Sequence, residues 1–200
     1  MPQFDLRGIK IAKYVNTSGT ITYTNAQTVG DAMNCNLELR YAEGRLYAES
    51  TLAEYMKKTV GGTISVGVKY IPSAAQQLMF GIGTKSRSIT YTPKGASTAT
   101  TASVTSLIST ATDEPAYVGL ACYAPDMIDG VKKYTCIKVA KCLFGQPSMT
   151  LQTAGESIVF NTPTTSGEFL ADDSTGQNLL EVAVCDDENE AIAWVAAVLA

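Results

Sequence analysis

Alternation of apolar and polar positions is the main pattern in this chain, and it is clearest between Val131 and Leu170. From Tyr134 to Leu143, successive side chains fall on opposite sides of a pleat, which predicts a strand. The alternation breaks at Gly145-Gln146-Pro147 and resumes at residues 158–161. Pro163 follows, and because proline cannot donate a ladder hydrogen bond, we expect this second strand at an edge or a bulge.

The same period-two pattern predicts further strands at residues 9–15, 20–23, 35–41, 63–71, 117–123 and 179–185. Strands 35–41 and 63–71 alternate cleanly, which is typical of a sheet with one face in water. We expect them to be partners. Turns are predicted at residues 16–19 and 125–130, where Gly, Asn, Asp and Pro gather.

Two helices are predicted. Residues 72–81 begin with proline and end with glycine, the usual signals for a helix start and stop. Asp187 and Glu190 form a capping-box pattern that starts a C-terminal helix over residues 187–200. Its apolar stripe around Trp194 is interpreted as core packing, with a subunit contact as the alternative.

Two connecting segments have unusual composition. Residues 42–59 predict a long inter-strand loop with a possible helical turn at Leu52–Met56, and loops of this length are usually functional or disordered. Residues 94–113 form a Ser/Thr/Ala-rich insert, in which 14 of the 18 residues from Gly95 to Thr112 are Ser, Thr or Ala. Low complexity favours a loose surface loop here over a Thr-rich hairpin.

These elements predict a mainly β fold with flanking helices, arranged as a β-sandwich or barrel-like body with a C-terminal helix. The length of 200 residues fits one domain, 1–200. The net charge of −4 argues against tight nucleic-acid binding, which requires clustered Lys and Arg. We expect a soluble chain with no signal peptide and no membrane insertion, because no stretch reaches the ~18 apolar residues of a spanning helix.

Catalytic and metal-binding patterns are missing from the sequence. It contains no histidine, no G-x-S-x-G elbow and no C-x-x-C pair. Folding could still assemble a catalytic carboxylate pair, but the sequence shows no such group, so we predict no enzyme, no cofactor and no metal site. The five cysteines are interpreted as reduced, buried thiols. Cys136 and Cys142 would lie about 20 Å apart on one strand, whereas a disulfide needs Cα atoms within ~7 Å.

Three weaker motifs have a simpler explanation. Residues 81–86 look superficially like a phosphate loop but lack its spacing, so a helix C-cap followed by a loop is favoured. Asp126 with Asp129, and residues 172–176, carry carboxylates that calcium would accept. Turn chemistry explains both groups.

The stretch G-Q-P followed by T-A-G-E-S-I-V-F-N-T-P-T-T-S-G, at residues 145–147 and 153–167, resembles the closing half of the major tail tube protein of long-tailed bacteriophages. That family carries a segment of the type K-G-E-S-I-E-F-x-T-P-x-x-x-G. The resemblance extends in order along most of the chain, through residues 8–12, 46–49, 62–68, 117–119 and 190–194. The insert at 95–112 is longer and less charged than the family pattern.

The resemblance implies a structural virion protein rather than an enzyme. In this family, six copies close into a ring with one continuous inner β-barrel, and the rings stack into a hollow tail tube. The implied partners are further copies of the chain (a homo-hexamer), the tape measure protein, the tail terminator and tail tip proteins, and DNA in transient, non-specific passage. The implied location is the virion tail, assembled in the host bacterial cytoplasm.

Alternation and this resemblance together assign two groups of residues. The wet faces of strands 35–41 and 63–71 are expected to line the lumen: Asn36, Glu38, Arg40, Thr63, Ser65 and Lys69. An ordinary solvated sheet face is the alternative. Residues 42–59 are expected to make ring-to-ring contacts through Glu43, Arg45, Tyr47, Glu49, Glu54 and Tyr55.

Other functions remain open at this level. A small-ligand-binding β-barrel would need an apolar pocket with a few convergent polar groups. A β-rich adhesion module would normally carry export signals or repeats. The tube of a contractile injection system or of a domesticated phage particle would keep the ring and change its biological setting.

Overall fold

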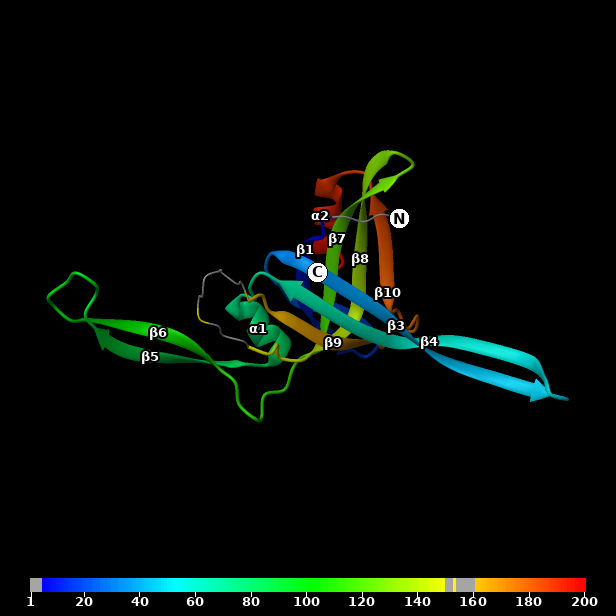
Figure 1. Ribbon diagram of the computed structural model, residues 1–200, viewed down its shortest axis with the longest axis horizontal. Coiled ribbons are helices and arrows are strands. Elements are labelled where there is room, and N and C mark those ends of the chain that lie inside the picture. The colour runs from blue at the N-terminus through cyan, green and yellow to red at the C-terminus, as the bar shows by residue number, and fades with distance from the viewer. Residues whose placement is uncertain (1–4, 150–152, 154–160) are drawn as a thin grey trace.

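The structure is a computed structural model that describes residues 5–149, 153 and 161–200. Within these residues, ten strands and two helices follow one another in this order: β1 (Arg7–Thr17), β2 (Thr20–Thr28), β3 (Ala32–Ala48), β4 (Thr51–Val68), α1 (Ser73–Phe80), β5 (Gly83–Tyr91), β6 (Thr100–Ile108), β7 (Val118–Ile128), β8 (Val131–Phe144), β9 (Thr164–Leu170), β10 (Leu180–Cys185) and α2 (Glu188–Ala197). Both helices and most of the strands form a body from which two hairpins project (Figure 1).

Eight strands form one antiparallel sheet in the order β2-β1-β7-β8-β9-β4-β3, and β10 also pairs with β8. β8 carries two neighbours end to end: β10 pairs with Tyr134–Val139 and β9 with Lys141–Phe144. In Figure 1, β7, β8 and β10 run up the view while β3, β4 and β9 cross it obliquely, so the sheet folds over on itself. Among the described residues, β5 and β6 pair only with each other.

The main core lies between the two halves of the folded sheet. Ile11 of β1 and Leu120 of β7 belong to the same buried cluster as Ile64 of β4 and Phe169 of β9. Helix α1 contributes Ala75, Leu78, Met79 and Phe80 to this cluster. Burial of this apolar surface is the main force that holds the two halves together.

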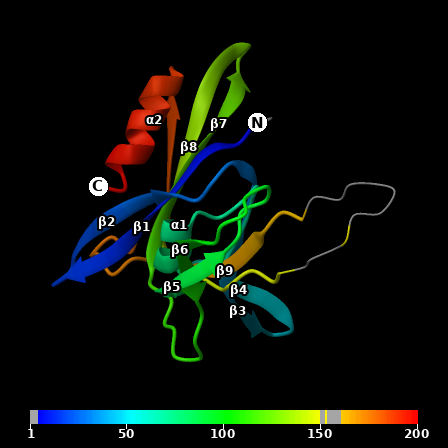
Figure 2. The same ribbon diagram turned by 90° about the vertical axis from the view of Figure 1, so that its left-hand side faces the viewer.

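A second core lies under α2, on the opposite face of β1, β7, β8 and β10. Ala191, Val195 and Leu199 are buried there with Tyr23 and Cys136, and Figure 2 shows α2 running beside β8 and β10. The predicted fold class, mainly β with a C-terminal helix, is therefore confirmed.

Most of the local predictions in the body are confirmed. α1 ends at Gly81, whose φ of 68° gives the left-handed C-cap that glycine adopts without strain. Asp187 caps α2 by accepting a hydrogen bond of 2.8 Å from the Asn189 amide. Glu190 accepts one of 3.0 Å from the Asp186 amide. All five cysteines are free thiols, and four of them are buried.

The prediction of a long inter-strand loop at 42–59, with a helical turn at 52–56, is wrong. β3 and β4 continue through this segment as a hairpin that turns at Glu49 and Ser50. Both turn residues have positive φ, 50° and 65°, which matches the twist of a two-residue hairpin loop. Such turns usually contain Asn-Gly, so the Glu-Ser pair concealed this one in the sequence.

The favoured prediction of a loose loop at 94–113 is also wrong. Residues 100–108 form β6, which pairs along its whole length with β5. The Thr-rich hairpin, the alternative that we favoured less, is the observed structure. Hydroxyl pairs across the two strands take the place of apolar packing, including Ser86 with Ser103 at 2.9 Å and Thr90 with Thr101 at 3.1 Å.

Two smaller predictions also need comment. The turn expected at 125–130 contains only Asp129 and Gly130, because β7 continues through Pro125 to Ile128. The strand expected at 158–161 lies outside the described residues except for Asn161, which is not in a strand.

Candidate assembly surfaces

Five of the six predicted lumen residues share one exposed face of β3 and β4. Asn36 lies opposite Ser65, and Glu38 lies opposite Thr63. Together with Ile64 and Ser166, these four residues line a hollow of about 250 Å³.

Arg40 continues the same face and forms an ion pair of 3.0 Å with Glu168 of β9. Sequence reasoning missed Ser166 and Glu168, because only the pairing of β9 with β4 brings them to this face. The sixth predicted residue, Lys69, lies beyond the end of β4 and contacts Asp31 at 3.6 Å.

The outer part of the β3–β4 hairpin, residues 41–59, pairs only with itself among the described residues, and we call it the β3–β4 arm. Figure 1 shows it extending away from the body. On the face that carries Glu43, polar contacts join side chains across the two strands. Lys57 Nζ lies 3.3 Å from Glu43 Oε1 and 4.0 Å from the centre of the Tyr41 ring.

Arg45 and Tyr55 extend this polar network. Arg45 approaches Glu43 Oε2 at 3.6 Å and lies over the Tyr55 ring at 5.7 Å. Hydrogen bonds from Tyr55 and Lys57 lower the pKa of the Glu43 carboxyl. Four predicted stacking residues, Glu43, Arg45, Tyr47 and Tyr55, thus share this face; Glu54 points to the other face, and Glu49 lies in the turn.

The second face of the β3–β4 arm is largely apolar and exposed. Met56 is 75% exposed opposite Gly44, and Leu46 is 58% exposed opposite Glu54. Exposed apolar groups that cluster on a projecting element mark an interaction surface more often than isolated ones do. Sequence reasoning placed this segment at an interface but did not identify the apolar face.

The β5–β6 hairpin, residues 83–108, is a second projection, which we call the β5–β6 arm. One of its faces carries hydroxyl side chains along most of its length. The other carries a mixture of basic and apolar side chains: Lys85, Arg87, Ile89, Tyr91 and Val104. The sequence does contain this alternation in 85–91, but the low complexity of the following insert hid its partner strand.

Three strands at the margins of the sheet have a partner on one side only, within the described part of the chain: β2, β3 and β10. The β10 margin is apolar, since Val182 is 61% exposed and Val184 is 49% exposed. An exposed strand margin offers unpaired backbone N–H and C=O groups to another chain.

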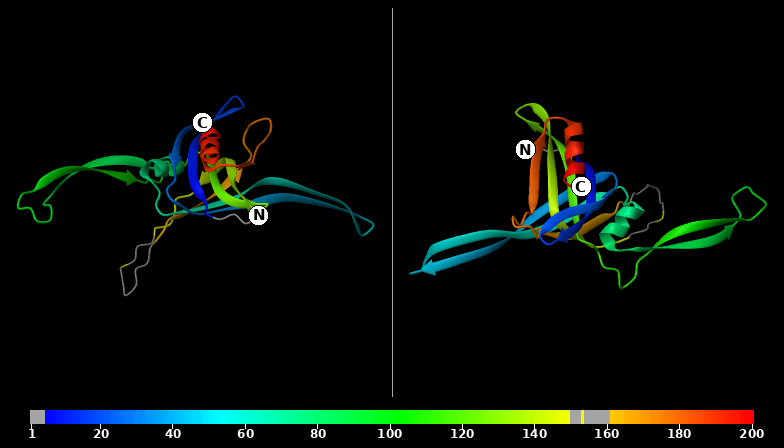
Figure 3. Two further views of the ribbon diagram at one scale, coloured as in Figure 1. Left: turned by 90° about the horizontal axis from the view of Figure 1, so that it is seen from above. Right: turned by 180° about the vertical axis from the view of Figure 1, so that it is seen from behind.

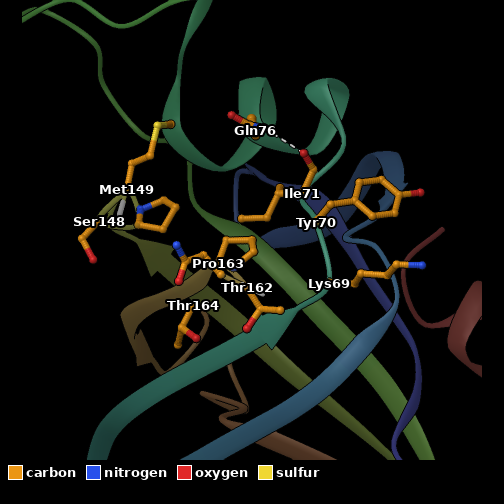
Figure 4. Close-up of a pocket in the computed structure, with 11 residues that line it drawn as sticks. Lys69, Tyr70, Ile71, Gln76, Ser148, Met149, Thr162, Pro163 and Thr164 are labelled. Carbon is orange, nitrogen blue, oxygen red and sulfur yellow. Dashed lines mark hydrogen bonds between the residues drawn. The ribbon is translucent and has the colours of Figure 1, made fainter. Parts of the chain in front are cut away.

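A groove of about 620 Å³ lies between the end of β4, the start of α1 and the segment before β9. Figure 4 shows Lys69 and Tyr70 at one side of this groove and Met149 at the other. Gln76 donates a hydrogen bond of 2.8 Å to the Ile71 carbonyl, so it is committed to the backbone. The space between the sheet halves, where a ligand-binding barrel would hold its ligand, is filled by side chains such as Phe144 and Phe169.

The carboxylates considered for calcium have other roles in the structure. Asp126 is fully buried and accepts a hydrogen bond of 3.2 Å from the Thr135 hydroxyl. Asp172 accepts from the amides of Ser174 and Asn178, which closes its own loop. Among the described residues, no group of three or more His, Cys, Asp or Glu side chains is placed to hold a metal ion.

Comparison of the sequence with protein-family models and with curated proteins gives no match. In the part of the chain that the structure describes, neither helix has the length and apolar character needed to span a bilayer.

Proposed function

We propose that this protein is a structural subunit that assembles with identical copies into rings, and that the rings stack into a hollow tube of the bacteriophage tail type. The observation that carries the proposal is the β3–β4 arm. It projects from the body and exposes Leu46 and Met56 to water while its other face is ordered by ion pairs. An isolated two-stranded hairpin is marginally stable in water, so such an arm is suited to packing against a neighbour.

The open sheet supports a ring. Pairing of one strand margin with the next copy is a heterologous contact, and repetition of such a contact closes into a ring when the rotation allows it. Candidates for these contacts are the exposed Val182 and Val184 on β10 and the outer margin of β3, which pairs with no strand but β4 in the described part of the chain. Closure would remove the margins that otherwise invite aggregation.

The polar face of β3, β4 and β9 supports a lumen. Its side chains are short or carry both charge signs, as in the Arg40–Glu168 pair, and the chain has a net charge of −4. A conduit for DNA has to avoid tight phosphate binding, which requires clustered cations. In this setting, the tape measure, tail terminator and tail tip proteins and DNA are the proposed partners, and the virion tail is the proposed location.

Negative-stain electron microscopy of the purified protein tests the proposal, with rings or tubes that have a central hole as the expected result. A matched variant replaces residues 44–56 with Asn-Gly, so that a two-residue turn joins Glu43 to Lys57, which lie opposite each other. This variant is expected to keep the thermal unfolding midpoint of the body and to lose polymerisation. Monodisperse monomers of the unmodified protein at all concentrations would refute the proposal. Tubes of normal length from the shortened variant would refute the role of the β3–β4 arm as an assembly contact.

A further inference from the structure

The charged side chains of the β5–β6 arm are all positive. Residues 83–112 contain Lys85, Arg87 and Lys94 and no acidic residue. None of these three cations forms an ion pair within the described residues, although most other cations of the chain do. Lys85 and Arg87 share a face with the exposed Ile89, Tyr91 and Val104. A face of this kind fits a partner surface that combines carboxylates with apolar side chains.

About half of the described acidic groups of the body are already neutralised. Those with a Lys or Arg partner within the same chain are Asp5, Asp31, Glu168, Asp173, Glu181, Asp186 and Glu188. On the β3–β4 arm, by contrast, Glu49 and Glu54 have no ion pair with any described residue, and Glu54 lies beside the exposed Leu46 and Met56. The arm therefore offers unpaired carboxylates and exposed apolar side chains on one projecting element.

We propose that the β5–β6 arm of one copy docks along the apolar face of the β3–β4 arm of a second copy. The inference rests on the proposed function, because it names one contact by which subunits would associate. The two arms leave the body in opposite directions (Figure 1 and both views of Figure 3). Each copy can therefore use one arm on each side, and the contact repeats from copy to copy.

The order of residues along the arms fits this docking. Arms that approach from opposite sides overlap with the tip of each at the base of the other. Lys85 lies near the base of the β5–β6 arm and Arg87 at the middle of β5. Glu49 lies in the tip turn of the β3–β4 arm, and Glu54 lies in its outer half, opposite Leu46. The opposite charges therefore meet.

The remaining positions are complementary as well. Val104 pairs with Arg87, and Leu46 pairs with Glu54, so these apolar side chains lie beside the opposite charges. Ile89, one step further along its arm, falls near Met56. Tyr91, toward the far end of the β5–β6 arm, reaches the base of the other arm, where Lys58 provides a cation for its ring. Nine residues of β5 span about 30 Å and the eight residues from 41 to 48 about 27 Å, so the two arms also match in length.

A nucleic acid would be the other partner for a basic arm. Three cations on the arm, only two of them on the apolar face, are too few for strong phosphate binding, since affinity depends on the number of phosphates neutralised. The apolar residues between the cations favour a protein surface. Binding of DNA by the arm is therefore an outcome that the test has to separate from self-association.

The test is a charge-swap series followed by sedimentation velocity and electron microscopy at low and high salt. The variant Lys85→Glu/Arg87→Glu is expected to raise the protein concentration at half-assembly at least tenfold. Adding Glu49→Lys/Glu54→Lys to the same chain is expected to restore assembly. Lys10→Glu/Lys13→Glu on β1 makes the same change in net charge outside both arms, and it is expected to leave assembly unchanged. Circular dichroism spectra and melting curves of all variants establish that the body remains folded.

The outcomes separate this inference from the proposed function. Tubes that form equally well with reversed Lys85 and Arg87 overturn the arm-to-arm contact and leave the tube intact. Failure of the second charge reversal to rescue assembly overturns the β3–β4 arm as the partner. The protein could instead self-associate into particles without a central hole, which the first charge reversal abolishes and the second restores. That result supports the arm-to-arm contact and refutes the tube. If the Lys85→Glu/Arg87→Glu variant loses binding to duplex DNA in a gel-shift assay while its assembly is unchanged, the β5–β6 arm binds nucleic acid. That result overturns the inference.

Discussion

Replacing Leu46 and Met56 with serine is expected to abolish assembly without destabilising the subunit. Full burial of a Leu or Met side chain contributes about 1.5–3 kcal/mol relative to exposure. Leu46 is 58% exposed and Met56 is 75% exposed in the free subunit. Scaling by these fractions gives roughly 2–4 kcal/mol for the pair at each contact, if both become fully buried. At 1.4 kcal/mol per factor of ten, that is a weakening of about 30-fold to 700-fold per contact.

Light scattering over a series of protein concentrations measures this shift in the assembly midpoint. Because both side chains are exposed, the free energy of unfolding of the monomer is expected to change by less than about 0.5 kcal/mol. Met127→Ser is a matched control, since Met127 is 45% exposed on β7 and lies outside both arms. An assembly midpoint that moves no further in the Leu46→Ser/Met56→Ser variant than in the control would refute the reasoning. This test concerns the arm as a contact surface and does not depend on what it touches.

Four further predictions follow from the body of the subunit and its polar face. Phe169→Ala removes a fully buried ring and is expected to lower the free energy of unfolding by ~3–5 kcal/mol and the melting temperature by ~6–20 °C. Phe169→Leu is expected to lower both by less, and calorimetry of the two variants measures the difference. Hydrogen bonds from Lys141 and Tyr14 lower the pKa of Asp173, so its stabilisation is complete above about pH 4 and is lost as the pH falls through the lower folded-state pKa. Asp173→Asn is therefore expected to destabilise at pH 7 and to match the unmodified protein at pH ~2 in urea unfolding; an equal difference at both values contradicts this. Burial raises the pKa of the Cys136 thiol to about 12, and Cys35 is the only partly exposed cysteine. A thiol reagent is therefore expected to label at most one cysteine rapidly in the folded protein and all five after denaturation. Asn36→Cys is expected to react with a small maleimide in tubes but not with a bulky polymer-linked one; equal reaction with both places Asn36 outside a lumen.

The sequence predicted the body better than the arms, for a physical reason. Body strands bury one face against a core, so their alternation is preserved, and the turn before β2 contains a glycine. In the β3–β4 arm, the register shifts after Arg40 and after Leu46, and each shift interrupts the period of two. In the β5–β6 arm, neither face meets a core, so no apolar alternation is required on β6.

The polar face could be predicted only in part. Alternation put Asn36, Glu38 and Arg40 on one side of a strand, which needs only local information. The pairing of Arg40 with Glu168 joins positions 128 residues apart in sequence. It depends on β9 pairing with β4, and the segment before β9 gave no signal for that pairing. Long-range neighbours of this kind come from the folded sheet and not from any single strand.

The margin of β10 links these observations to assembly. Monomeric β-proteins usually protect a strand margin with lysine, proline, a bulge or a covering element. In β10, the face opposite α2 carries Val182 and Val184, and its only described neighbour strand is β8. Selection against aggregation acts on such a margin whenever the subunit is free. Two exposed valines at this margin and an exposed apolar arm are expected of a subunit whose neighbours cover both surfaces after assembly. This reasoning ties the arms and the margin to one assembly, so substituting lysine for Val182 is expected to impair the same assembly that the Leu46→Ser/Met56→Ser variant loses.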